Sequence, residues 1–99
     1  MKLREIAHSR TGDKGDISNI SLIAFKSEDY ELIKKKVTER VVKEWFKGIV
    51  QGKVVRYELP NLHAFNFVMY GALGGGVTKS LAQDMHGKSL SYKLLDLDI

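Results

Sequence analysis

The chain has 99 residues, enough for one domain with a modest hydrophobic core and too few for a second. It contains no cysteine, which excludes disulfides, thiolate zinc sites and thiol nucleophiles. The net charge of +4 comes from basic and acidic residues that are interleaved along the chain, a pattern typical of a solvated surface rather than of a nucleic-acid interface. Residues 1–10 lack the apolar region of a signal peptide, and no apolar run approaches the roughly 20 residues that cross a bilayer. We therefore expect a cytoplasmic protein with neither a nucleic-acid nor a membrane partner.

The N-terminal half is predicted to contain two strands and a helical region. Residues 2–8 and 17–25 have strand patterns, with a polar loop at 9–16 between them. The second strand is apolar on both sides of the pleat, which predicts an interior strand covered on two faces. The segment that follows carries apolar side chains at helical spacing. Because Ser27 and Thr38 each precede acidic residues and suit N-caps, this segment is either one long helix or two short ones.

The C-terminal half begins with a half-exposed strand at residues 53–60, which ends at the only proline. Residues 61–73 fit either a second helix capped by Asn61 or a strand. A helix here gives the order strand, strand, helix, strand, helix, strand. After a turn at 86–88, residues 89–99 end in alternating apolar side chains, which predicts a final strand.

This order of elements predicts one α+β domain over residues 1–99. The nearest common arrangement is a ferredoxin-like two-layer sandwich, with a mainly antiparallel sheet and the helices on one face. The other face of the sheet would be open and would carry apolar side chains. Such a face commonly contacts a partner.

The predicted first loop lies within the stretch HSRTGDKGD, which concentrates ionisable side chains. Gly12 and Gly15 permit positive φ, so backbone N–H groups can converge on one point. Such a concavity binds anions, and Arg10 and Lys14 would add positive charge. The same residues also suit a tight surface turn, and both interpretations stay open.

Asp13 and Asp16 complicate the anion hypothesis, because their carboxylates repel an anion. They would instead bind a cation, although the calcium-loop spacing is absent, or cap a tight surface turn. His8 lies beside them and is a candidate general acid or base. These three residues are the catalytic candidates, and neither a resident metal nor a cofactor is expected.

A second polar stretch, GALGGGVTKS at residues 71–80, has four glycines in six positions. The glycines allow a phosphate to approach the backbone closely, next to the hydroxyls and the cation of residues 78–80. They equally suit a turn packed against a neighbouring strand or subunit.

Three stretches carry a family resemblance: HSRTGDKGDISNISLIA, VVRYELPNLHAFNFVMYGALGGGVTKSL and DMHGKSL. In this order, and over nearly the whole chain, they resemble the AtuA-like domain at the C-terminal end of the acyclic terpene utilisation AtuA family. Thr11 stands where that family usually has serine. The resemblance implies a ferredoxin-like fold and a link to the catabolism of acyclic terpenes and related branched acids through acyl-CoA intermediates.

The resemblance also implies which residues form a site. The matching positions expected to bind a ligand or a partner are Arg10, Gly12, Asp13, Lys14, Gly15, Asp16, Asn19, Asn61, Asn66, Gly74, Gly75, Gly76 and Ser80. Gly71, Asp84, Gly87 and Lys88 match the family pattern as well. We expect the segments 10–16 and 71–80 to meet at one rim, where they would hold a carboxylate or a CoA phosphate, or clasp a larger subunit.

In long family members this domain is fused to a large N-terminal region. The resemblance therefore implies a small accessory subunit of an AtuA-type enzyme, which docks onto a separately encoded large subunit, forms a homo-oligomer, or does both. Its pathway would be acyl-CoA or organic-acid catabolism. The alternative is a self-contained lyase or hydratase acting on a carboxylate or acyl-CoA substrate, in which Asp13 or Asp16 works with His8.

Overall fold

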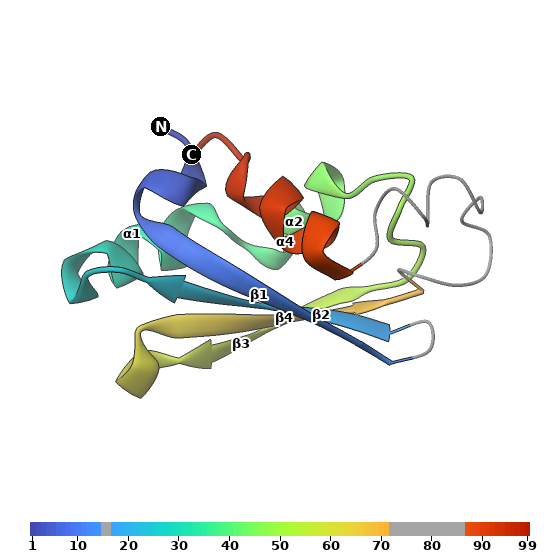
Figure 1. Cartoon of the computed structure of the whole chain (residues 1–99), viewed down its shortest axis with the longest axis horizontal. Helices are drawn as coiled ribbons and strands as arrows, with labels where there is room; N and C mark the ends of the chain where they lie inside the picture. The colour runs from blue at the N-terminus through green and yellow to red at the C-terminus, as the bar shows by residue number, and fades with distance from the viewer. Residues whose placement is uncertain (15–16, 72–86) are drawn as a thin grey trace.

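The structure, a computed structural model, describes residues 1–14, 17–71 and 87–99, with the backbone alone for residues 13–14 and 87–89. In this part of the chain the strands form one antiparallel sheet in the order β1-β2-β4-β3. The elements are η1 (Leu3–Glu5), β1 (Ala7–Lys14), β2 (Ile17–Ala24), α1 (Ser27–Lys36), α2 (Glu39–Trp45), β3 (Val54–Leu59), η2 (Pro60–Leu62), β4 (Ala64–Tyr70) and α4 (Gly87–Leu95). The α-helices lie on one face of the sheet (Figure 1). The expected α+β, ferredoxin-like two-layer fold is confirmed.

Two hairpins build the sheet. β1 pairs with β2 and β3 pairs with β4, and the two hairpins join through β2 and β4. Ile17 lies opposite Tyr70 at one end of the central pair, and Ile23 lies opposite Ala64 at the other. The edge strands are therefore β1 and β3, which come from distant parts of the chain.

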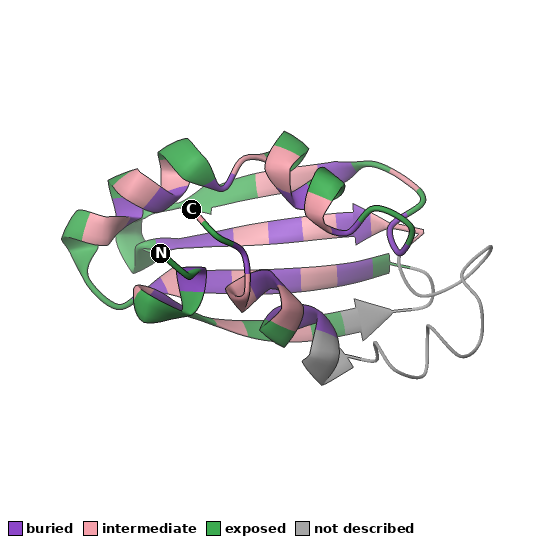
Figure 2. Cartoon of the chain, turned by 90° about the horizontal axis from the view of Figure 1, so that it is seen from above, coloured by how far each residue is buried: buried purple, intermediate pink, exposed green. Residues whose placement is uncertain are grey.

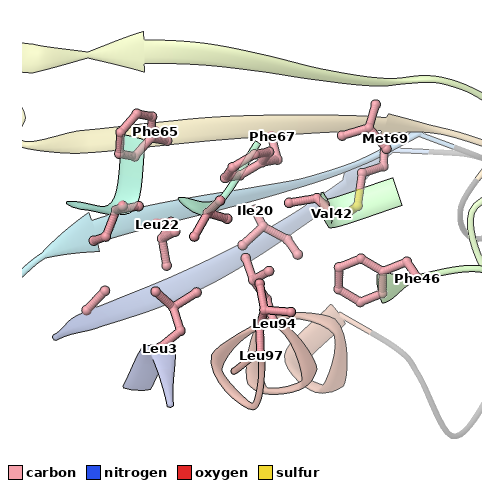
Figure 3. Packing of buried hydrophobic residues seen from close by; sticks show 14 of the residues in the cluster. Leu3, Ile20, Leu22, Val42, Phe46, Phe65, Phe67, Met69, Leu94 and Leu97 are labelled. Carbon is pink, nitrogen blue, oxygen red and sulfur yellow. The ribbon is translucent and has the colours of Figure 1, made fainter. Parts of the chain in front are cut away.

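The core lies between the sheet and the helices, as the labelled side chains of Figure 3 show. Alternate residues of the two central strands are buried, and the bands along these strands in Figure 2 follow that alternation. The largest fully buried side chains include Ile20, Leu22, Phe46, Phe65, Phe67 and Leu94. Burial of such side chains, each contributing about 1.5–3 kcal/mol, is the main force that holds the layers together.

The helical region consists of two helices rather than one. Thr38 is the N-cap of α2, and its Oγ1 accepts a hydrogen bond of 3.2 Å from the backbone N–H of Val41. For α1 the predicted cap was wrong, because Lys26 is the N-cap and Ser27 is the first helical residue. The indole Nε1 of Trp45 donates to the carbonyl of Lys93 at 2.7 Å, which ties α2 to α4.

The predicted first loop was wrong for residues 9–14, which belong to β1. Each of these residues pairs with β2, from Ser9 opposite Leu22 to Lys14 opposite Ile17. Polar residues form a strand here because β1 is an edge strand, and its outer positions remain in contact with water. The neighbouring β2 is interior to the sheet, but the described residues cover only one of its faces, so the expectation of two covered faces was wrong for this part of the chain.

Two further elements differ from the prediction. Within residues 61–73 the described part is the end of η2 followed by strand β4, because Phe65, Phe67 and Met69 alternate toward the core. The predicted final strand is instead helix α4. Its buried residues Leu90 and Leu94 lie one helical turn apart, and this spacing packs the helix onto β1.

Candidate functional site: the open face of the sheet

Within the described residues, the face of the sheet opposite the helices is uncovered (Figure 1). Because side chains alternate along a strand, this face carries the residues between the buried positions. We call it the open face and define it by His8, Arg10, Gly12, Ile17, Asn19, Ser21, Ile23, Val55, Tyr57, Leu59, Ala64, Asn66, Val68 and Tyr70. It combines a polar centre with apolar side chains at its margins.

The polar centre is an amide pair on the two central strands. Asn19 Nδ2 donates a hydrogen bond of 3.1 Å to Asn66 Oδ1, and both side chains are half-buried. The register places Ser21 opposite Asn66, with Arg10 and Tyr57 next to them on the edge strands. A cation, a hydroxyl, an amide and a phenol therefore form one row across the sheet.

Gly12 has a steric role in this centre. A β-carbon at residue 12 would lie 2.7 Å from Oδ1 of Asn19, which is closer than real contacts allow. Gly12 therefore makes room for the Asn19 side chain. The positive φ that a glycine permits is not used at this position, since Gly12 is an ordinary strand residue.

A hollow of about 530 Å³ opens on the same face. Small residues, including Ser21 and Ala64, form its floor, while Arg10 stands on one side and Leu59 and Leu62 on the other. Among the described residues, the Arg10 guanidinium forms neither an ion pair nor a hydrogen bond. The hollow thus combines one free cation with an aliphatic wall.

His8 lies at the margin of the open face, where its ring stacks on Phe25 with 5.4 Å between the centroids. Asp13 is five residues further along the same strand, a backbone separation of about 17 Å. The two residues therefore lie far apart along β1. In the described part of the chain, no group of three or more metal-binding side chains comes together.

The family assignment follows from a comparison of the whole chain. The family model of the AtuA ferredoxin-like domain matches residues 1–99. The chain belongs to this family. Searches of the curated proteins and of the solved structures found no match. Among the described residues of this AtuA ferredoxin-like domain, no helix is long and apolar enough to span a membrane.

The AtuA ferredoxin-like domain brings part of the expected site together. Arg10, Gly12, Asn19 and Asn66 meet on the open face. Asn61 lies apart from them in η2, in the turn between β3 and β4, where it is exposed. The sequence positions alone gave no sign that Asn19 and Asn66, 47 residues apart, would form a hydrogen bond.

Several expected site residues lie outside the described residues. These are Gly15, Asp16, Gly74, Gly75, Gly76, Ser80 and Asp84, together with the side chains of Asp13, Lys14 and Lys88. The expected rim between segments 10–16 and 71–80 therefore stays a prediction. Gly71 is described: it has φ of +68°, and its carbonyl accepts a hydrogen bond from the N–H of Gln51.

Sequence reasoning missed two kinds of residue in this AtuA ferredoxin-like domain. Ser21, Tyr57 and Leu59 belong to the open face, and strand alternation could have assigned them once the sheet order was known. Arg56 points to the opposite face, where its guanidinium Nη1 donates to the carbonyls of Lys34 at 2.8 Å and Val37 at 2.9 Å. The arginine of the RYELP stretch is thus a structural link between β3 and α1.

Proposed function

We propose that this AtuA ferredoxin-like domain is an accessory subunit that docks through its open face onto a separately encoded large AtuA-type chain. The pair would work in acyl-CoA or organic-acid catabolism, as the family resemblance implies. One observation carries the proposal: exposed apolar side chains gather at the open face and its margin. Tyr57 is 51% exposed, Leu62 65% and Phe25 59%. Exposed apolar side chains on one face, bordered by polar residues, are typical of a protein interface.

The composition of the open face favours contact with a partner that can dissociate, rather than an interface that is permanently buried. Apolar side chains surround the polar Asn19–Asn66 pair, whose amides hydrogen-bond to each other. Interfaces between chains that also exist apart have this mixture of apolar and polar surface. Arg10 adds a positive charge at the β1 side, which would favour an acidic margin on the partner.

The edge at β3 is less suited to docking than the open face. The backbone N–H of Arg56 donates a hydrogen bond of 2.7 Å to the carboxylate of Glu39, at the start of α2. An extended partner strand needs such N–H groups to be free. Contact across the open face is therefore the mode of association that we propose.

Co-expression with the large chain, followed by size-exclusion chromatography, tests the proposal. The two chains should elute together. Tyr57→Asp places a charge in the proposed interface and should reduce co-elution at least tenfold. Tyr92→Asp is the matched control, because Tyr92 is 64% exposed on α4, in the helical layer.

A second substitution protects the test against misfolding. Leu62→Asp lies in the short η2 turn rather than in a strand, and it should weaken the complex as Tyr57→Asp does. Circular dichroism of each variant checks that the fold is retained. Co-elution that both aspartate substitutions leave unchanged would overturn the proposal.

The lyase or hydratase alternative needs His8 within hydrogen-bond reach of a catalytic carboxylate. The stacking of His8 on Phe25 and its separation from Asp13 do not favour that arrangement. It stays a prediction from the sequence.

A further inference from the structure

We infer that the hollow on the open face binds a small carboxylate with an aliphatic chain. The two ends of the hollow differ in chemistry, and this difference defines the ligand. Arg10 on β1 supplies a cation, whereas Leu59 and Leu62 supply an apolar wall at the β3–β4 turn. The inference deepens the proposed function, since a ligand held here would be enclosed when the large chain docks.

Arg10 is suited to a carboxylate because its charge is not already used. Arg4 pairs with Asp96, and Arg56 bonds to helix carbonyls and to Glu58. Within the described residues, Arg10 has no such partner, and none of the residues that line the hollow is acidic. A free guanidinium can bind a carboxylate through two parallel N–H···O bonds.

The remainder of the hollow fits an alkyl chain. Ile23 and Ala64 lie between Arg10 and the leucine wall, on the central strands. Their side chains offer no hydrogen bonds, so this part favours CH₂ and CH₃ groups. The volume of about 530 Å³ falls within the roughly 300–1,000 Å³ of small-molecule sites. About 14 Å of sheet separates the two edge strands, which leaves room for an extended medium-length chain.

Ser21 adds a polar group on the Arg10 side of the floor. The register places Ser21 directly opposite Arg10, one strand away. Its hydroxyl can donate to a carboxylate oxygen that the guanidinium holds. Arg10 and Ser21 would thus fix the head of the ligand, while the aliphatic residues select its tail.

A titration of the isolated ¹⁵N-labelled chain with heptanoate, followed by NMR, tests the inference. Heptanoate should shift the amide signals of Arg10, Ser21, Ile23 and Ala64 in a saturable way. Heptan-1-ol has the same chain without the charge, and it should bind at least tenfold more weakly. Arg10→Gln should weaken heptanoate binding at least tenfold, because it removes a charge-assisted contact.

Arg40→Gln is the matched control, since Arg40 is an exposed arginine of α2 in the helical layer. It should leave heptanoate binding unchanged. Ser21→Leu, which fills the floor of the hollow, should weaken binding while the protein stays folded. Equal binding of acid and alcohol, unchanged binding by Arg10→Gln, or shifts centred on another surface would each overturn the inference. The titration needs no large chain. Heptanoate binding can therefore fail while co-elution succeeds, or succeed while co-elution fails.

Discussion

Among residues near the surface, Arg56 should be one of those whose substitution lowers the free energy of unfolding most, although it lies on an edge strand. Its side chain is 15% exposed, and its guanidinium lies 5.2 Å from the centre of the Phe65 ring. Nη1 donates to two carbonyls at the C-terminal end of α1, those of Lys34 and Val37. The cation therefore both hydrogen-bonds to the helix end and interacts favourably with its dipole.

The expected loss can be worked from these contacts. A hydrogen bond to a charged group contributes about 1.5–3 kcal/mol. Arg56→Met removes two such bonds but keeps an apolar stem against Phe65, and water can partly reach the freed carbonyls. We expect a loss of about 3 kcal/mol in the free energy of unfolding, or roughly 15 °C in Tm for a domain of this size. Arg56→Lys keeps the charge but replaces the planar fork with a single compact ammonium, and it should lose about half as much.

Urea unfolding followed by the fluorescence of Trp45, the single tryptophan, measures this loss. Trp45 is a suitable reporter because its indole bonds α2 to α4. Arg40→Met, an exposed change on α2, should cost less than about 0.5 kcal/mol. If Arg56→Met costs no more than Arg40→Met, the guanidinium does not hold α1 to the sheet and the reasoning is refuted.

Two further predictions concern single contacts. Gly12→Ala should lower the free energy of unfolding by about 1 kcal/mol, because the new β-carbon displaces Asn19 from its hydrogen bond to Asn66. In an Asn19→Ala background the same change should be neutral. An equal loss in both backgrounds, measured by urea unfolding, would contradict this. Thr38→Ala should cost about 1 kcal/mol through loss of the α2 N-cap. Thr38→Ser keeps the accepting hydroxyl and should unfold at nearly the wild-type urea midpoint, and a midpoint as low as that of Thr38→Ala would count against the cap.

The elements that the sequence predicts well are those with one buried face and a local pattern. Tyr30 and Ile33 lie at helical spacing in α1, and both are buried. Thr38 marks the break between α1 and α2 because its hydroxyl caps the second helix. In each case, neighbouring residues decide the conformation, so no knowledge of the rest of the fold is needed.

The elements that the sequence predicts wrongly depend on pairing and packing with other elements rather than on their own local pattern. Residues 9–14 form a strand because β2 pairs with them, and their polar side chains alone give no strand signal. In the C-terminal segment, the alternation of Leu95, Leu97 and Ile99 competes with the helical spacing of Leu90 and Leu94. Packing of α4 on β1 decides in favour of the helix, and this contact is not visible in the local pattern.

The candidate site shows the same division. The family resemblance selects Arg10, Asn19 and Asn66 as site residues, but the sheet order is needed to place them on one face. Ser21 and Leu59 carry no motif and enter the site only through strand register. The sequence therefore identifies some of the site residues, and the order and register of the strands determine which other residues lie beside them.

Thiol labelling tests docking through the open face most directly, because the chain has no cysteine of its own. Tyr57→Cys places one reactive thiol on the open face, and Tyr92→Cys places one on the helical layer. When the large chain binds, the labelling rate at residue 57 should fall at least tenfold, while the rate at residue 92 should stay the same. A complex that forms and leaves residue 57 as reactive as in the free chain would contradict the account.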